Sequence, residues 1–248
     1  MTEPASGHWF EPVADHLGAA YLRYSFTKGT AQEVAFLVDE LGLTPGQRLL
    51  DVGCGPGRHS YALAAAGLEV VGIDISRRFV DLASADAPAG ATFVRGDARD
   101  LPFDAEFDAA ISLCQGAFGL AGGPGAPLDA DGEVLRGIAR ALKPGGVAAV
   151  SAFSAYFQVR WLEDHDSFDA AAGVNHERTE VRDESGTPTG ADLWTTCFTP
   201  RELRLLATQS GLAPRAIWSV TPGAYARDEP TIDTPEFLLV ATRPPPDA

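Results

Sequence analysis

The sequence contains little cysteine and none of the close cysteine pairs that bind zinc. Cys54, Cys114 and Cys197 are the three cysteines in 248 residues, and they are widely spaced. An odd set without a CxxC pair argues against both a disulfide framework and a cysteine zinc site. We therefore expect no metal site and a reduced, cytoplasmic compartment.

Basic residues are also scarce. The chain has 19 lysines and arginines against 34 acidic residues, which gives a formal charge of −15, and the bases are scattered along its length. Such a chain repels a phosphate backbone, so no nucleic-acid partner is expected. No apolar run approaches the length of a membrane span, and the N-terminus MTEPASGHWFEPVADH lacks the basic and apolar regions of a signal peptide. We expect a monomer or homodimer that does not bind membranes.

Short apolar runs alternate with helical patterns in the middle of the chain. The runs are RLLDV (48–52), EVVGID (69–74), ATFV (91–94), FDAAIS (107–112) and VAAVSAF (147–153). Helical patterns cover 57–66, 77–85 after a cap at Ser76, and 131–142. This alternation predicts an α/β fold with a parallel sheet, right-handed crossovers and helices on both faces.

Further elements flank this core. A capping box of Thr30 and Glu33 predicts a helix over 31–41, and a second box at Thr199–Glu202 begins a helix that ends at Gly211. Two late strands are expected over 214–220 and 236–242. We expect one domain over 1–248, which divides into a helical cap (1–44), a core (45–153), an insertion (154–198), a C-terminal helix and strands (199–243) and a tail (244–248).

A glycine-rich loop joins the first strand to the first core helix. It has the pattern D-x-G-x-G-x-G, with Asp51 followed by Gly53, Gly55 and Gly57. The glycines permit a tight turn and a close approach of backbone N–H groups to a ligand at the start of a helix. Asp74 ends the next strand, where a carboxylate can accept hydrogen bonds from both ribose hydroxyls. The pattern predicts a nucleoside-containing cofactor, and simple turn glycines are the alternative.

Two common cofactor classes do not match this loop. A phosphate-binding loop of the Walker type needs Gly-Lys-Ser/Thr, which the sequence lacks. A nicotinamide-binding loop has G-x-G-x-x-G, but its third glycine position is Arg58. An acid two residues before the first glycine, Asp51, instead suits the orientation of an ammonium group or an ordered water.

Five motifs in order resemble the class I S-adenosylmethionine-dependent methyltransferases over about residues 45–153. They are LLDVGCGPG (49–57), VVGIDIS (70–76), RGDARDLPF (95–103), FDAAISLCQGAFG (107–119) and LKPGG (142–146). The resemblance implies a doubly wound, Rossmann-like sheet of seven strands in the order 3-2-1-4-5-7-6, with the last strand antiparallel. It also implies S-adenosylmethionine as cofactor, S-adenosylhomocysteine as product and a small-molecule acceptor.

The same resemblance implies a set of cofactor-binding residues. They are Tyr24, Asp51, Gly53, Cys54, Gly55, Gly57, Asp74, Ile75, Asp97, Ala98 and Leu113. Asp97 would meet the adenine amino group and Ala98 the ring edge, with a turn-forming role as the alternative for Asp97. Gln115 would border the methyl group on the acceptor side. The tetrapeptide Ser-Leu-Cys-Gln ending there is not the Asn/Asp-Pro-Pro-Tyr of enzymes that methylate bases and glutamines, which favours a small metabolite.

The insertion over 154–198 leaves the carboxyl edge of the sheet and is rich in aromatic residues. We expect it to form a lid over the acceptor, with Trp161 and Trp194 as binding residues and His165 as a candidate general base. Packing of a small subdomain is the alternative. Residues 163–184 carry eight acids and two arginines, which over a pocket would favour an amine acceptor and otherwise form a solvated surface.

Two other functions are compatible with these motifs. Some relatives of the family use the bound cofactor for chemistry other than methylation. A non-catalytic protein that binds an adenosyl ligand is the second alternative, although the intact loop and Asp74 argue against it.

Overall fold

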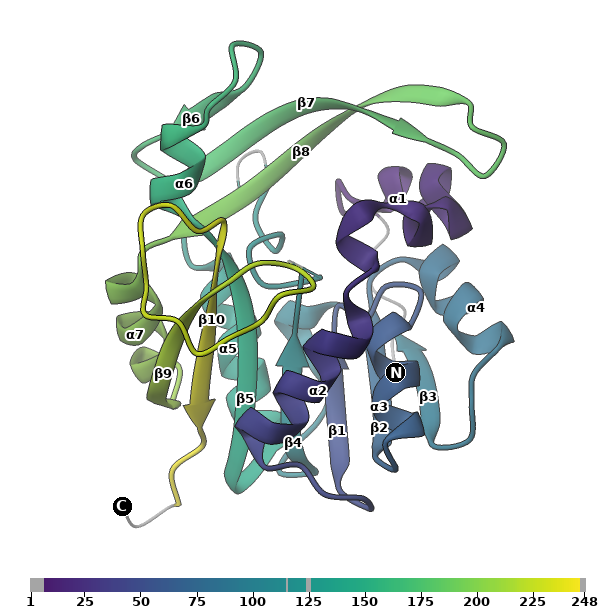
Figure 1. Cartoon of the computed structure of the whole chain (residues 1–248), viewed down its shortest axis with the longest axis vertical. Coiled ribbons are helices and arrows are strands. Elements are labelled where there is room, and N and C mark those ends of the chain that lie inside the picture. Colours follow the sequence, from purple (N-terminus) through teal and green to yellow (C-terminus); the bar gives the residue numbers. More distant parts are fainter. Residues whose placement is uncertain (1–6, 115, 124–125, 246–248) are drawn as a thin grey trace.

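A body of seven strands, within a ten-stranded sheet that also includes strands of the insertion, forms the centre of the computed structural model, which describes residues 7–114, 116–123 and 126–245 (Figure 1). Its order is β3-β2-β1-β4-β5-β10-β9, and β10 is antiparallel to both of its neighbours while β1 to β5 are parallel. The predicted order and the antiparallel last strand are confirmed. The strands are β1 (Arg48–Val52), β2 (Glu69–Asp74), β3 (Ala91–Arg95), β4 (Phe107–Ser112), β5 (Leu142–Ser154), β9 (Ala213–Val220) and β10 (Glu236–Thr242).

Helices cover both faces of this sheet because its inner strands are apolar on both sides. In β1, Leu49 packs against the helices on one face of the sheet, and Leu50 packs against the helices on the other face. Both side chains are fully buried. The first face carries α2 (Thr30–Leu41) and α3 (Arg58–Ala65), and the second carries α5 (Ala130–Ala141) and α7 (Pro200–Gln209). Helix α4 (Arg77–Ala85) lies beside β2 and β3.

Two of the three predicted helix caps are confirmed. The Ser76 hydroxyl accepts a hydrogen bond from Phe79 N at the start of α4, and Thr199 and Glu202 form the reciprocal box of α7. The box predicted at Thr30 and Glu33 is wrong, because α2 begins after Gly29 without a side-chain cap. Glu33 is buried and bonds to residues of α3 instead, so a tertiary ion pair replaces the local cap.

The N-terminal segment contains the short elements α1 (Glu11–Leu17), η1 (Gly18–Arg23) and η2 (Ser25–Thr27). It passes above the carboxyl ends of the central strands in Figure 1. Another 3₁₀ turn, η3 (Ala98–Asp100), follows β3 and contacts α5.

The insertion forms a long β-hairpin that crosses above the same edge of the sheet (Figure 1). Its elements are α6 (Ala155–Arg160), β6 (Ser167–Asp169), β7 (Val174–Arg182) and β8 (Pro188–Phe198). β8 joins the central sheet through two residues beside the end of β5, and β7 pairs with β8 along its length. The far end of the hairpin bonds to the N-terminal segment and to α4. Glu184 accepts from Ala19 N over 2.9 Å and pairs with Arg78 of α4 over 2.7 Å.

No helix within the described ranges is both long and apolar enough to cross a membrane.

Candidate functional site

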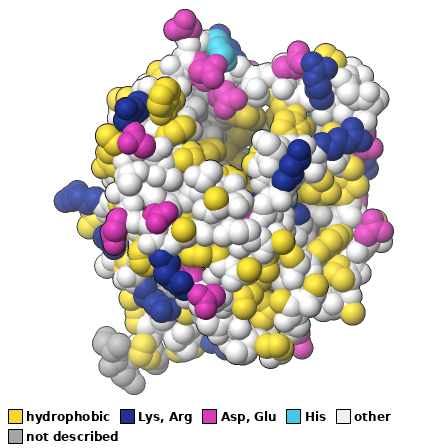
Figure 2. All heavy atoms as spheres, in the orientation of Figure 1, with side chains coloured by type: hydrophobic (Ala, Val, Ile, Leu, Met, Phe, Trp, Pro, Cys, Tyr) yellow, Lys and Arg dark blue, Asp and Glu magenta, His cyan; other side chains and the backbone are white. Residues whose placement is uncertain are grey.

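Two adjoining cavities lie at the carboxyl edge of the sheet, beneath the hairpin. The larger has a volume of about 310 Å³ and the smaller lies beside β2 and η3. Figure 2 shows this face of the molecule hollowed beneath the hairpin, with hydrophobic side chains inside the hollow. Both cavities are lined by Phe10, Gly53, Asp74, Gly116 and Leu120. The two cavities therefore share a wall, and one elongated ligand can extend from one into the other.

Asp74 lies in this shared wall at the end of β2. The backbone N–H groups of Gly55 and Ser76 donate to its two carboxylate oxygens, each over 2.8 Å. Burial raises the pKa of Asp74 to about 6, and these two N–H donors only partly oppose that rise. A carboxylate offers about four acceptor positions, so two remain for hydroxyl groups in the cavity.

The glycine loop reaches the loop after β4 through a contact of backbone with backbone. Gly53 has φ of 75°, and a Cβ built on it would lie 2.1 Å from the carbonyl carbon of Gly116. Only glycine fits this position, because any side chain would push the two loops apart and the left-handed conformation disfavours other residues. This approach brings the end of β1 and the end of β4 to one cavity wall.

The smaller cavity contains the residues predicted to surround adenine. Ile75, Asp97 and Ala98 line it, together with Arg99. The Arg99 guanidinium donates to both oxygens of Asp97, over 2.5 and 2.9 Å. Burial alone would raise the pKa of Asp97, but the hydrogen bonds from Arg99 outweigh it and hold the pKa below its usual value. Asp97 is therefore an ionised acceptor at this wall.

Four of the predicted cofactor residues do not line either cavity and instead support the walls. The Asp51 carboxylate accepts from the Ser60 hydroxyl over 2.6 Å and is buried. Cys54 is also buried, and burial raises the pKa of its thiol. Gly57 precedes α3 with φ of 87°, and the Leu113 carbonyl accepts from Gly116 N.

The N-terminal segment and α4 supply an aromatic wall to the larger cavity. Tyr24, which was predicted at the methionine end of the cofactor, lines it with Tyr21, Phe26 and Phe79. The Tyr21 and Phe79 rings are 5.0 Å apart between centroids, and burial raises the pKa of Tyr21. This wall places aromatic rings beside Asp74 at the edge of the larger cavity.

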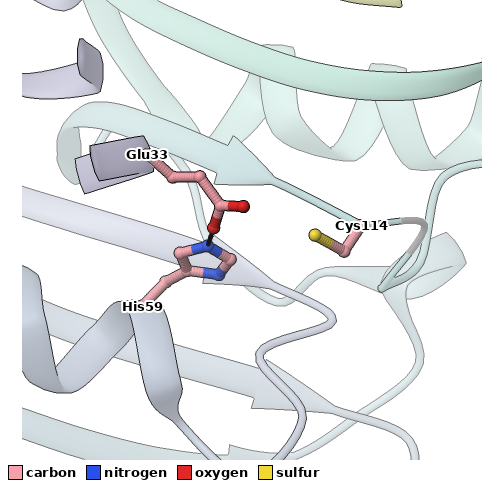
Figure 3. A group of neighbouring side chains, drawn as sticks. All are labelled: Glu33, His59 and Cys114. Carbon is pink, nitrogen blue, oxygen red and sulfur yellow. Dashed lines mark hydrogen bonds and ion pairs between the residues drawn. The ribbon is translucent and has the colours of Figure 1, made fainter. Parts of the chain in front are cut away.

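Beneath the larger cavity, Glu33, His59 and Cys114 present an oxygen, a nitrogen and a sulfur atom within 4.8 Å of one another (Figure 3). The Arg58 guanidinium occupies the same place, 2.7 Å from the Glu33 carboxylate and 2.8 Å from the Cys114 sulfur. Burial raises the pKa of the Cys114 thiol, so it keeps its proton. A fixed positive charge and a protonated thiol both disfavour a metal ion. The group is a hydrogen-bonded cluster that holds α2, α3 and the end of β4 together.

The face of the hairpin that lines the larger cavity is not the face that carries Trp194, the residue predicted to bind the acceptor. Glu177, Val181, Leu193 and Thr195 line that cavity. Trp194 lies on the opposite face because neighbouring residues of a strand alternate in direction. Its ring stacks on the His176 ring, with centroids 4.8 Å apart, and lies edge-on to the Trp9 ring, with centroids 5.4 Å apart. Trp9 lines the larger cavity and Trp194 does not, so Trp194 contacts that cavity only through Trp9.

The other predicted acceptor residues are not brought to the cavity. Trp161 is 60% exposed, and the His165 side chain is 56% exposed beside Glu163 and Asp166. Both belong to the surface connection between α6 and β6, whose position the sequence pattern does not define. Gln115 lies outside the described residues. We accordingly leave Trp161 and His165 out of the acceptor site.

Sequence reasoning missed several residues that line the cavities. Trp9, Phe10 and Glu177 belong to no motif, although the alternation along β7 could have indicated an inward face for Glu177. Glu236 had a clearer signal. Glu236 begins the strand predicted to be antiparallel, and the start of an antiparallel strand lies beside the carboxyl ends of its parallel neighbours. In the structure it is 4% exposed and lines the larger cavity.

Comparison with known proteins agrees with this geometry. The family model described as a methyltransferase domain matches residues 49–146. The cypemycin N-terminal methyltransferase of a Streptomyces species is 33% identical over 80% of this chain and 84% of its own length. The demethylmenaquinone methyltransferase of Renibacterium salmoninarum is 40% identical over 48% of this chain, which spans under half (46%) of that protein.

A solved structure extends the likeness to the whole fold. The CcbJ methyltransferase from Streptomyces caelestis superposes with a TM-score of 0.72 at 20% identity, over 98% of this chain and all of that one. The sheet order, the Asp74 site and the long match to the cypemycin enzyme lead to one assignment. The chain belongs to the class I S-adenosylmethionine-dependent methyltransferases and is a methyltransferase that uses S-adenosylmethionine as its cofactor.

Proposed function

We propose that this enzyme methylates a small-molecule acceptor bound in the larger cavity and releases S-adenosylhomocysteine. The observation that carries the proposal is the wall shared by the two cavities. It contains Asp74 and Gly53 and borders a cavity of about 310 Å³, which supports a nucleoside site beside an acceptor site. A space of this size suits a small ligand.

Residues of this chain fit the cofactor along the shared wall. Asp74 would accept hydrogen bonds from the ribose hydroxyls, and Asp97 and Ala98 would border the adenine. Tyr21 and Tyr24 would cover the methionine end. The cofactor supplies a methyl group already activated by its sulfonium charge, so the protein mainly orients the acceptor toward that methyl group.

The hairpin supports a small acceptor rather than a macromolecule. Its far end is held by the bonds of Glu184 to Ala19 and Arg78, so the cavity is covered from above. A nucleic-acid strand would also meet a chain with a formal charge of −15. One relative is named for demethylmenaquinone, a small molecule, which supports the same class.

The proposal is tested by turnover with S-adenosylmethionine labelled in its methyl group. A metabolite library and preparations of protein and RNA serve as acceptors, and the products are separated by size. We expect label in a low-mass product together with an equal amount of S-adenosylhomocysteine. Label transferred only to protein or RNA would contradict a small-molecule acceptor.

We expect the affinity for S-adenosylhomocysteine to fall as the pH is lowered through about 6. Ribose hydroxyls donate hydrogen bonds, so they favour the ionised carboxylate of Asp74, whose pKa is raised to about 6 by burial. A proton therefore competes with the ligand, and the Kd should rise about tenfold from pH 7 to about pH 5. Calorimetric titration at several pH values across this range measures the Kd. Asp74→Asn cannot titrate and should show no such slope, whereas a flat wild-type profile would argue against ribose binding by Asp74.

Gly53→Ala should weaken cofactor binding more than a glycine change elsewhere. Its new Cβ would meet the Gly116 backbone at 2.1 Å and separate the two loops that form the shared wall. Gly42→Ala is a matched control, since Gly42 also has a positive φ, 64°, but nothing lies within 4 Å of the added atom. The control should lose only about 1–2 kcal/mol of unfolding free energy from its backbone conformation. Equal Kd values for S-adenosylhomocysteine in both variants would show that the contact with Gly116 is unimportant.

A further inference from the structure

The charged side chains that line the larger cavity are all acidic. They are Asp74, Glu177 and Glu236, and no lysine, arginine or histidine lies among the described residues of its lining. Asp74 is on the ribose side, where it receives the N–H groups of Gly55 and Ser76. Glu177 comes from the hairpin and Glu236 from the start of β10, and both line the part of the cavity away from the ribose side, since neither borders the smaller cavity.

Glu177 stands apart from the other acids of the insertion. Of the eight acids between residues 163 and 184, it is the one that lines the larger cavity. Glu180, three positions along β7, is exposed and pairs with Arg182 over 2.5 Å. The solvated-surface interpretation therefore suits Glu180, whereas Glu177 directs negative charge into an apolar space.

The position of Glu177 is electrostatically unfavourable without a cation. Burial raises its pKa, and Asp166 and Glu163 raise it further, while a hydrogen bond from Thr179 and the proximity of His165 oppose the rise. A positive group in the cavity would offset both the burial and the repulsion.

The rest of the lining also suits a cation with an apolar body. Seven aromatic side chains line the cavity, and aromatic faces attract positive charge as well as apolar surface. They are Trp9, Phe10, Tyr21, Tyr24, Phe26, Phe79 and Phe153. A carboxylic acid on the acceptor side would face Glu177 and Glu236, with no lysine, arginine or histidine among the described lining residues, which selects against anionic acceptors.

We propose that the acceptor is an amine on an apolar body and that Glu177 selects it by holding its positively charged nitrogen. This inference rests on the proposed methyl transfer in the larger cavity. The bound ammonium gives one proton to water, and the nitrogen lone pair then forms the new bond to the methyl carbon. The electron pair of the broken carbon–sulfur bond remains on sulfur, which leaves a neutral thioether and a methylated ammonium product.

The test uses phenethylamine, phenylethanol and phenylacetate, which share a ring and differ in charge. Phenylbutylamine is added to cover a longer body. Binding of each compound to protein saturated with S-adenosylhomocysteine is measured by calorimetry. For the wild type we expect at least one amine to bind ten times more tightly than the alcohol and the acid. Equal or tighter binding of the alcohol or the acid, or binding of neither amine, would overturn the proposal.

Variants separate a role in acceptor selection from a structural one. Glu177→Gln should weaken amine binding at least tenfold, while the affinities for phenylethanol and S-adenosylhomocysteine stay unchanged. Glu180→Gln, on the same strand but exposed, should leave all of these values unchanged. If Glu177→Gln instead weakens the binding of S-adenosylhomocysteine and leaves amine binding unchanged, Glu177 contacts the cofactor and the inference is wrong. Failure of the wild type to bind S-adenosylhomocysteine at all would contradict the proposed function itself. This binding is therefore measured first.

Discussion

Replacement of Asp74 by alanine should raise the Kd for S-adenosylhomocysteine by about a hundredfold. The change removes the acceptor of two expected bonds from ribose hydroxyls, and hydrogen bonds to a charged group contribute roughly 1.5–3 kcal/mol each. Two such bonds at the lower limit amount to about two powers of ten in affinity. Calorimetric titration of the purified variant measures the effect.

Asp74 also has a structural role that the experiment must separate. Its oxygens accept from Gly55 N and Ser76 N, so the variant's unfolding midpoint is recorded alongside the Kd. Asp81→Ala, at an exposed position on the neighbouring helix α4, serves as the control and should bind as the wild type does. A folded Asp74→Ala protein with unchanged affinity would remove Asp74 from the cofactor site.

Glu33→Gln should cost about 3–5 kcal/mol of unfolding free energy, the usual penalty for breaking a buried ion pair. The Glu33 side chain is fully buried, and it accepts from Arg58, His59 and Gly223 N at 2.7, 2.7 and 2.8 Å. The variant would leave the Arg58 charge buried without its carboxylate. Urea unfolding measures the loss. Glu133→Gln is the control, because Glu133 is exposed in its pair with Arg136 and should contribute under about 1 kcal/mol.

The contribution of Glu33 should also depend on pH. Burial would raise its pKa, but the His59 and Arg58 contacts outweigh burial and lower it from 4.5 to about 2. A lowered pKa stabilises the folded state above the unfolded value, so this contribution is complete above about pH 4.5 and disappears toward pH 2. The difference in stability between wild type and Glu33→Gln should therefore narrow over this range. A constant difference would mean that the Glu33 charge does not contribute.

The core of the fold could be predicted because its signals are local. The five apolar runs and the helices between them appear as predicted, except that β5 begins at Leu142 rather than at residue 147. The Ser76 cap and the Thr199–Glu202 box also form as expected. The order of the strands came from the resemblance to a family, since periodicity alone does not specify neighbours. The glycine-loop pattern and the end of the next strand located Gly53 and Asp74, which do line the shared wall.

The acceptor side could not be predicted in the same way. The aromatic content of 154–198 indicated a lid, but it did not distinguish Trp194, on the face of the hairpin away from the larger cavity, from Leu193, which lines that cavity. A shift of one residue in strand register exchanges the two faces, and the sequence of a half-exposed strand specifies this register weakly.

The sequence by itself therefore determined the alternation of strands and helices, the glycine loop and the carboxylate that ends β2. Tertiary structure alone decided the partners of charged groups that are distant in the chain. Glu33 has the spacing of a local cap, yet it is buried against Arg58, 25 residues away. Glu236 and Glu177 meet at one cavity although β10 and the hairpin are separate in sequence. Backbone periodicity depends on neighbouring residues, whereas the burial and pairing of a charge depend on which surfaces the folded chain brings together.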